Sequence, residues 1–240
     1  FWGQQMGKVE VRMRSNRAIV CAALLMLGVA ESTPAALGVR AIAAGGQRSL
    51  ALTSDGTVWE WGSDVQPQWS GPAPVQVGGL SRIVAIAAAP TYNLAVKEDG
   101  TVWAWGAGWS GRELIEYSVP VQLTGLAGVV GVAGGHNHTL ALKGDGTVWS
   151  FGYNFQGELG DGTTTNSSTP VQVSGLSRVV AIAAGSQFSL ALKDDGTVWA
   201  WGFNRLGQLG DGTTTNRLAP VQVSGLAGVV AIAAGDTHSL

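Results

Sequence analysis

The sequence predicts an all-β protein, a β-propeller built from four-stranded antiparallel blades. The pentapeptide Asp-Gly-Thr-Val-Trp recurs at spacings of 44, 46 and 50 residues, and every copy lies among short apolar or alternating segments. A period of roughly 40 to 50 residues with four short strands is typical of a propeller blade, whereas a parallel β-helix has a shorter period. The four copies begin at Asp55, Asp99, Asp145 and Asp195.

The fourth repeat shows how the strands of a blade are assigned. Residues 179–185 form a short apolar run, and residues 189–193 and 197–201 alternate, so each of the three predicts a strand. The Asp-Gly pair at 195–196 favours a tight primed turn, because Gly adopts positive φ without steric cost. Residues 220–223 predict a brief outer strand that begins at its proline, since proline is tolerated at a strand start or a sheet edge.

The repeats divide the chain into a propeller domain, residues 37–240, and a preceding segment, residues 1–36. We expect an open arc of about four complete blades plus the start of a fifth, because the last copy stops inside its second strand. The expected blades are 38–80, 81–126, 127–176, 177–226 and the partial 227–240.

Three segments of the fourth repeat carry a resemblance to a known family: residues 183–192, 195–202 and 207–210. They are similar to the regulator of chromosome condensation repeat, whose members form seven-bladed propellers. The likeness extends over about 200 residues from Gly38 onward and implies that the arc is a fragment of a seven-bladed ring. The first two blades depart from the family pattern, because they lack the long loop found at 157–166 and 207–216. Propellers of this kind host unrelated functions, so the resemblance implies a scaffold and no single activity.

The composition narrows the class of function. Charged residues make up 12% of the chain and hydrophobic residues 45%, with 36 glycines, which fits a compact, turn-rich β protein and excludes a disordered one. From Glu31 onward 15 acidic residues face 10 basic ones, a balance of −5. Nucleic-acid binding needs a basic patch. The acidic balance therefore argues against a nucleic-acid partner and against the chromatin role of the family's namesake, and guanine-nucleotide exchange would need a nuclear setting.

Residues 1–36 are typical of upstream sequence followed by a bacterial secretory signal peptide. Basic residues surround Met13, a plausible start, and precede a 13-residue apolar run at 18–30 and small residues at 31–36. The run is shorter than the roughly 20 residues of a membrane span, so no stable membrane anchor is expected. A buried core helix is the alternative. We expect secretion or periplasmic export, with cleavage between about Ala30 and Ala36, which would remove Cys21, the single cysteine, and with it any disulfide or thiolate metal site.

One repeat position holds a large side chain in every copy, which favours a structural role for the histidines found there. His136 lies two residues before one of them, but two histidines on a strand need a third ligand to bind a metal, and the sequence shows none. The residues at this position are Arg48, Tyr92, His138, Phe188 and His238.

Asp161 and Asp211 begin two copies of Asp-Gly-Thr-Thr-Thr-Asn. The pattern favours turns in which side chains satisfy local backbone groups, and calcium binding, which needs several oxygen ligands, is the alternative. No cofactor is expected. No Ser-His-Asp or Cys-His arrangement and no phosphate-binding Gly loop is evident, which argues against an enzyme. Glu113 and Glu116 form the only acidic pair in an irregular loop, so a polysaccharide-acting propeller enzyme remains an alternative.

The aromatic residues divide into core and surface candidates. Pairs such as Trp199 with Trp201 are two residues apart on one strand face, so we expect them to fill the space between blades. Aromatic and arginine residues in the variable loops can either fold back onto their own blade or bind a partner, as such residues dominate interface hot spots. The protein-binding candidates are Trp69, Trp109, Arg112, Tyr153, Phe155, Phe203 and Arg205.

These observations together predict a non-catalytic, extracytoplasmic protein-interaction module whose loops bind a protein partner of unknown identity on a rigid scaffold. No small-molecule substrate is evident. A secreted enzyme inhibitor that resembles the β-lactamase inhibitory propeller type is a narrower alternative, although its repeats are shorter than these.

The leader prediction is tested by expressing the chain with its own N-terminal segment in a bacterial host. We expect a mature protein that begins between Glu31 and Ala36, because signal peptidase cleaves after small residues that follow the apolar run. Intact-mass analysis of the secreted or periplasmic product measures this start. A product that still contains Cys21 would overturn the prediction.

Overall fold

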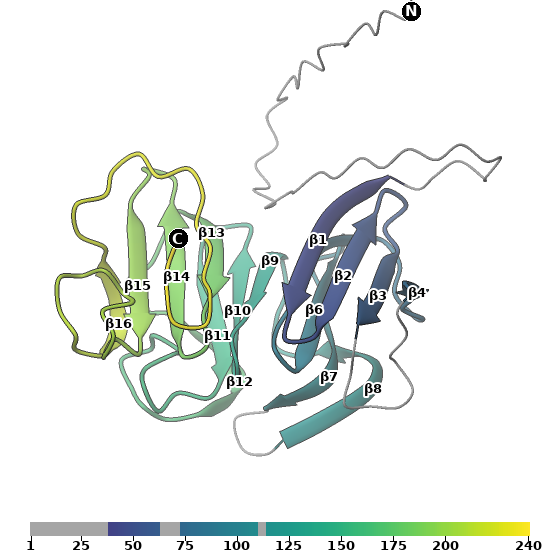
Figure 1. Ribbon diagram of the computed structural model, residues 1–240, viewed down its shortest axis with the longest axis horizontal. Coiled ribbons are helices and arrows are strands. Elements are labelled where there is room, and N and C mark those ends of the chain that lie inside the picture. The colour runs from purple at the N-terminus through teal and green to yellow at the C-terminus, as the bar shows by residue number, and fades with distance from the viewer. Residues whose placement is uncertain (1–37, 63–72, 110–113) are drawn as a thin grey trace, which may run out of the picture.

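The computed structural model describes residues 38–62, 73–109 and 114–240. These residues form four four-stranded antiparallel sheets, each with its strands in chain order, and they contain no helix. Figure 1 shows the sheets following one another along the chain as an open arc, from β1–β4 to β13–β16. The predicted fold class is therefore confirmed. The predicted leader lies outside the described residues.

The strands keep the same order in each blade. Blade one contains β1 (Val39–Gly45), β2 (Arg48–Thr53), β3 (Val58–Gly62) and β4 (Val75–Gln76). Blade two contains β5 (Ile83–Ala88), β6 (Tyr92–Lys97), β7 (Val102–Trp109) and β8 (Leu114–Leu123). Blade three contains β9 (Val129–Gly134), β10 (His138–Lys143), β11 (Val148–Gly152) and β12 (Ser167–Gln172). Blade four contains β13 (Val179–Ala184), β14 (Phe188–Lys193), β15 (Val198–Gly202) and β16 (Arg217–Gln222).

The part of the chain that the structure describes holds no helix long and apolar enough to cross a membrane.

The Asp-Gly hairpin between the second and third strands forms as predicted, but its turn is longer than a two-residue primed turn. In blade one the amide of Gly56 donates to the carbonyl of Thr53 at 3.0 Å. The amide of Thr53 donates to the carbonyl of Thr57, also at 3.0 Å. Only Gly56 has positive φ, at 78°. This is the three-residue hairpin loop in which an ordinary turn is followed by one left-handed glycine, so it needs a single Gly where a primed turn needs two positive φ values.

The side chains of the repeated pentapeptide hold one another in place. In blade two Asp99 Oδ1 accepts the amide of Thr101 at 3.0 Å and its hydroxyl at 2.7 Å. The hydroxyl of Thr101 then accepts the indole N–H of Trp103 at 3.1 Å, and Lys97 Nζ lies 4.0 Å from the Trp103 ring centre. The hydrogen bonds from Thr101 lower the pKa of Asp99, as expected when donors favour the ionised form. The same chain of hydrogen bonds occurs in the other three blades.

The second strand of each blade carries Leu-Ala-Leu, or Leu-Ala-Val in blade two, so one face of the strand is bulky and the other is smooth. Leu140 and Leu142 pack in a cluster with Ala191 and Trp201 of the next blade, since alternate residues of a strand point to opposite faces. Equivalent clusters join blade one to blade two and blade two to blade three. The predicted core role of the tryptophan pairs is confirmed for Trp105 and Trp201, which are 2% and 0% exposed. The first tryptophan of each pair is only half-buried.

Hydrogen bonds from buried aromatic side chains also cross the blade interfaces. The indole N–H of Trp105 donates to Glu60 Oε2 of the preceding blade at 2.9 Å, and that of Trp201 donates to the carbonyl of Glu158 at 2.8 Å. Blade three has Phe151 at the equivalent position, which carries no donor. There the hydroxyl of Tyr92 crosses the interface and donates to the carbonyl of His138 at 2.6 Å. Each of these three buried donors therefore has an acceptor on the neighbouring blade.

The outer strand differs from the prediction that it begins at its proline. In blade four β16 already begins at Arg217, and Pro220 lies inside it. The pairing of β15 with β16 shifts register between Ala200 and Gly202, and such an irregularity leaves a residue without a ladder hydrogen bond. A proline lacks the amide hydrogen, so it is tolerated at that point of an edge strand.

The loop of blade two also differs from the prediction, because much of it is strand. The β7–β8 hairpin extends past the blade, with Gly106 paired to Tyr117, Ala107 to Glu116, and Trp109 to Leu114. The β-branched and aromatic residues at 115 and 117 favour this extension. Glu116 therefore lies in a strand and not in an irregular loop.

The beginning of the fifth repeat folds back on itself and packs against blade four. Ala234 forms an antiparallel bridge with Ser239, and the amide of Val229 donates to the carbonyl of Gly196 at 3.1 Å. Ile232 and Ala234 pack against the buried cluster that contains Phe188. The fifth repeat therefore continues the arc in the same way as its predecessors.

Candidate binding face

The variable segments that the structure describes emerge at one end of the blades, which we call the loop face. The amide of Tyr153 donates to the carbonyl of Asn137 at 2.8 Å, and the amide of Phe203 donates to the backbone carbonyl of Gln187 at 2.9 Å. The triplets before the second strands therefore lie beside the loops that follow the third strands. The extended β7–β8 hairpin projects from the same end, whereas the Asp-Gly hairpins lie at the opposite end, the turn face. The loop face comprises 46–48, 90–92, 136–138, 186–188, 236–238, the loops 153–166 and 203–216, and the ends of β7 and β8 at Trp109 and Leu114.

A buried asparagine organises each long loop. Asn154 is 0% exposed; its Nδ2 donates to the carbonyls of Thr163 and Thr165, both at 3.1 Å. Its Oδ1 accepts the amide of Leu159 at 2.9 Å. Asn204 makes the equivalent contacts in blade four. Because one side chain satisfies several backbone groups of its own loop, the loop holds its shape without regular secondary structure.

Asp161 and Asp211 act as turn residues in these loops. Asp161 Oδ1 accepts the amide and the hydroxyl of Thr163, both at 2.9 Å, and Asp211 makes the same contacts with Thr213. Asp211 also pairs with Arg217 at 2.7 Å. Although burial opposes its charge, the donors from Thr213 and Arg217 lower the pKa of Asp211 to about 2. Among the described residues no three of His, Cys, Asp and Glu gather closely enough to hold a metal.

Large apolar side chains lie exposed on the long loops. The rings of Tyr153 and Phe155 meet edge to face with centres 4.4 Å apart, and Phe155 is 56% exposed. Leu206 is 69% exposed. Phe203 is half-buried, and Arg205 is exposed. Leu206 was not among the sequence candidates; the one signal for it is an apolar residue in a loop that is otherwise polar.

The remaining candidates are placed less fully. Trp109 is the last residue of β7, in the extended hairpin. Trp69 and Arg112 lie outside the described residues, as does Glu113. The structure therefore brings Tyr153, Phe155, Phe203 and Arg205 together on one face and leaves the role of the other candidates a prediction.

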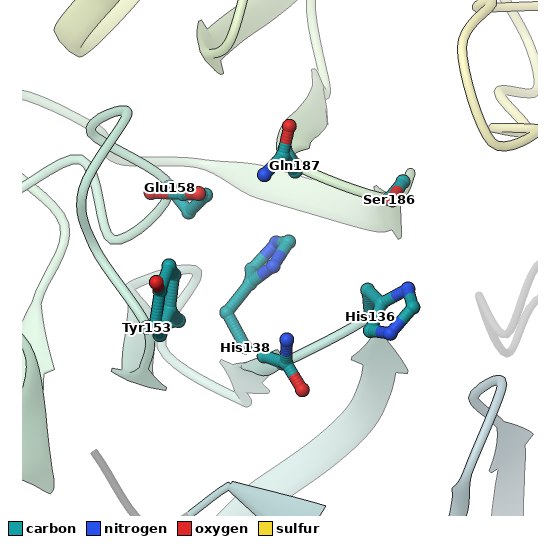
Figure 2. Close-up of a pocket in the computed structure, with 7 residues that line it drawn as sticks. His136, His138, Tyr153, Glu158, Ser186 and Gln187 are labelled. Atoms are coloured by element: carbon teal, nitrogen blue, oxygen red, sulfur yellow. The ribbon is translucent and has the colours of Figure 1, made fainter. Parts of the chain in front are cut away.

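A pocket of about 350 Å³ lies on the loop face between blades three and four. Figure 2 shows His138 in its middle, with Glu158 and Tyr153 on one side and Ser186 and His136 on the other. The remaining lining residues are Asn137 and Gln187.

A second pocket of about 230 Å³ marks the inner mouth of the arc, where the first strands of the four blades end and the fifth repeat contributes residues 234–236. The amide of His136 donates to the carbonyl of Ser186, and that of Ser186 donates to Asp236, both at 3.1 Å. A Cβ on Gly45 or Gly46 would overlap the backbone of the next blade, so these glycines permit the close approach at the axis. Backbone hydrogen bonds between neighbouring repeats therefore hold the inner mouth together.

His138 forms a buried hydrogen-bonded chain that joins the two blades. Its Nε2 lies 2.9 Å from Ser189 Oγ, and that hydroxyl donates to the carbonyl of Glu158 at 3.0 Å. Since the one hydroxyl proton is used on this carbonyl, His138 Nε2 carries a proton and donates. A Cβ on Gly135 would overlap the imidazole, so this glycine makes room for it.

The His138–Ser189 pair superficially matches a nucleophile with its base, which the sequence did not reveal because the two residues are 51 positions apart. The geometry does not suit catalysis, however. Ser189 is 0% exposed and His138 is 1% exposed, and burial lowers the pKa of His138 to about 4. A base with that pKa takes a proton poorly near neutral pH, and the hydroxyl points at a carbonyl. The structural role predicted for His138 agrees with this burial.

The comparisons with known proteins identify the family. The sequence model of the RCC1-like domain matches residues 2–240, nearly the whole chain. The chain belongs to the RCC1-like domain family. A comparison with curated proteins finds no match. The sequence resemblance to the regulator of chromosome condensation repeat is thus confirmed.

Solved structures show the same fold in RCC1-like relatives. Human WBSCR16 superposes with a TM-score of 0.75 at 26% identity, covering 84% of this chain and 56% of that one. Prp20p from Saccharomyces cerevisiae, characterised for its binding to Gsp1p and histones, gives 0.74 at 22% identity, covering 87% and 56%. Yeast RCC1 (Prp20) bound to Kap60 gives 0.69 at 25% identity, covering 84% and 53%. The chain therefore spans about half the length of these relatives.

The burial of His138 makes stability depend on pH. Its pKa falls from 6.5 in the unfolded chain to about 4 in the folded one, so the unfolded chain binds the extra proton first as the pH drops. The stability is complete above pH 6.5 and is lost as the pH falls toward 4, by on the order of 3 kcal/mol. Phe188 occupies the equivalent position in blade four, which makes His138→Phe a matched variant.

We expect the free energy of unfolding of the wild-type chain to fall relative to that of His138→Phe as the pH drops from 7 to 4. Denaturant titrations at several pH values measure the difference, and His136→Phe, at an exposed position, is the control. Parallel curves for wild type and His138→Phe would show that the histidine is not held neutral by burial.

Proposed function

We propose that this chain is a non-catalytic, extracytoplasmic protein-interaction module that binds a protein partner through its loop face. The observation that carries the proposal is the pair of exposed apolar groups, Phe155 and Leu206, on two loops fixed by buried asparagines. Exposed apolar side chains on a rigid scaffold are typical of interaction sites.

The two long loops form one surface because they are joined to each other. Asn216 Nδ2 donates to Gln156 Oε1 at 2.6 Å, and the amide of Gly162 donates to the carbonyl of Leu218 at 2.9 Å. A surface that is already ordered loses less conformational entropy on binding than a flexible loop does. The loops of blades three and four are thus suited to tight recognition of a folded partner.

Three further observations support a binding role over catalysis. The Ser189 hydroxyl is buried and already donates to a backbone carbonyl. Asp236 is the only acidic residue that lines the inner mouth among the described residues, whereas a polysaccharide-acting enzyme needs paired carboxylates. A relative in the same family, yeast RCC1 (Prp20), is seen bound to another protein, Kap60.

The extracytoplasmic location is part of the proposal and rests on the amino-terminal segment. Its basic residues, 13-residue apolar run and small residues follow the order of a secretory leader. The net charge of −5 from Glu31 onward supports a partner that is not a nucleic acid.

The binding face is tested with the double variant Phe155→Ala/Leu206→Ala. The immobilised chain is used to capture a polypeptide from the periplasm or medium of the source bacterium, and the affinity of that purified polypeptide is then measured. We expect the double variant to weaken binding at least tenfold, because truncating exposed hot-spot side chains removes contact area, and to leave the melting temperature nearly unchanged.

The matched control is Val130→Ala. Val130 is 53% exposed at the beginning of β9, which lies toward the turn face. The Val130→Ala variant should bind the captured polypeptide with the same affinity as the wild type. If Val130→Ala loses the partner and the double variant keeps it, the binding face has been placed on the wrong end of the blades.

A further inference from the structure

Glu158 is a buried carboxylate without a cation. It is 1% exposed, and its Oε2 accepts the amide of Gln156 at 2.8 Å. In the part of the chain that the structure describes, the ion pairs involve other acids, and none reaches Glu158. Burial raises the pKa of Glu158, against backbone hydrogen bonds that lower it. A buried charge is costly unless it is paired, so this carboxylate needs an explanation.

The loop itself does not need the charge. Blade four has Gln208 at the equivalent position, and Gln208 Oε1 accepts the amide of Leu206 at 3.1 Å, the counterpart of the bond from Gln156 to Glu158. The two loops share the same buried asparagine and the same turns. A neutral amide therefore supports this loop geometry, and the negative charge of Glu158 is additional to it.

The surroundings of Glu158 suit a positively charged planar group. It lines the 350 Å³ pocket together with the half-buried Tyr153, and Figure 2 shows both residues on the same side of His138. Asn137 and Gln187 also line the pocket. His138 is neutral near pH 7, because burial lowers its pKa to about 4. The volume is within the range of small-ligand sites and exceeds what one side chain requires.

We propose that this pocket takes a guanidinium group, the arginine side chain of a protein partner, with Glu158 as its counter-ion. This inference rests on the proposed function and adds the chemistry of the partner residue. A guanidinium pairs with a carboxylate through two parallel hydrogen bonds and stacks on an aromatic ring, and Glu158 and Tyr153, which both line the pocket, offer these two groups. Lysine is the weaker fit, since an ammonium has no flat face for the ring.

The test uses N-acetyl-arginine amide as the probe, with the citrulline and lysine amides as its neutral and ammonium counterparts. The indole N–H of Trp201 reports on the site by NMR, because it donates to the carbonyl of Glu158; its signal is assigned by its loss in Trp201→Phe. We expect the arginine probe to shift this signal with a dissociation constant on the order of millimolar. The lysine probe should bind several-fold more weakly than the arginine probe, and the citrulline probe at least tenfold more weakly.

Glu158→Gln is the decisive variant, because glutamine already stands at this position in blade four. The variant should fold as the wild type does and bind the arginine probe at least tenfold more weakly. Glu98→Gln removes the same charge from an exposed residue, 60% exposed in its side chain, and should leave binding unchanged. Equal binding of arginine and citrulline, or full binding to Glu158→Gln, would overturn the proposal.

The outcomes separate this inference from the proposed function. If the captured polypeptide binds through Phe155 and Leu206 while the arginine probe does not bind, the pocket assignment is wrong and the interaction module stands. If the probe binds through Glu158 while Phe155→Ala/Leu206→Ala leaves partner affinity intact, the guanidinium site stands and Phe155 and Leu206 have been misassigned as partner contacts.

Discussion

The carbonyl oxygen of Glu158 joins blades three and four, and much of the described surface depends on it. It accepts the Trp201 indole N–H at 2.8 Å and the Ser189 hydroxyl at 3.0 Å. Both donors belong to the next blade and are 0% exposed. Because they would be unsatisfied elsewhere, they fix the position of the loop that carries Glu158. The side chain of the same residue then lines the pocket, so the blade interface and the candidate site share one residue.

The repeats divide their residues between a constant frame and a variable end. The Asp-Thr-Trp hydrogen bonds and the apolar faces of the second strands recur in all four blades, since each blade must cover the apolar face of its neighbour. The long loops are free of that constraint because they lie beyond the strands. Differences such as Phe155 against Arg205, or Glu158 against Gln208, therefore change the surface of the loop face without changing the blade. This separation supports a scaffold whose specificity depends on its loops.

Much of the fold could be predicted from the sequence because its signals are local. The spacing of the pentapeptide and the Asp-Gly pairs predicted the number and order of the strands, and the structure confirms both. The outer strand was placed too late, because Pro220 lies at a register shift that no local pattern reveals. The β7–β8 extension was missed because the sequence prediction placed Glu113 and Glu116 in an irregular loop.

The site could be predicted only in part. Tyr153 and Phe155 stood out as aromatic residues in a loop, a property of the sequence alone. The residues His138, Glu158 and Ser189 come together across a blade interface from positions 20 to 51 residues apart, and their hydrogen bonds depend on how two blades pack. Glu158 also could not be recognised as a candidate from its residue type. Its selection depends on its burial and on the comparison with the glutamine at the equivalent position of the next repeat.

The central claim is that the loop face binds the partner, and amide hydrogen exchange with and without the captured polypeptide tests it most directly. We predict that the partner slows exchange at 136–138, 153–158, 186–188 and 203–208, while the Asp-Gly hairpins at 97–101, 143–147 and 193–197 exchange as in the free chain. Protection of the hairpins, with unchanged exchange in the long loops, would contradict the account.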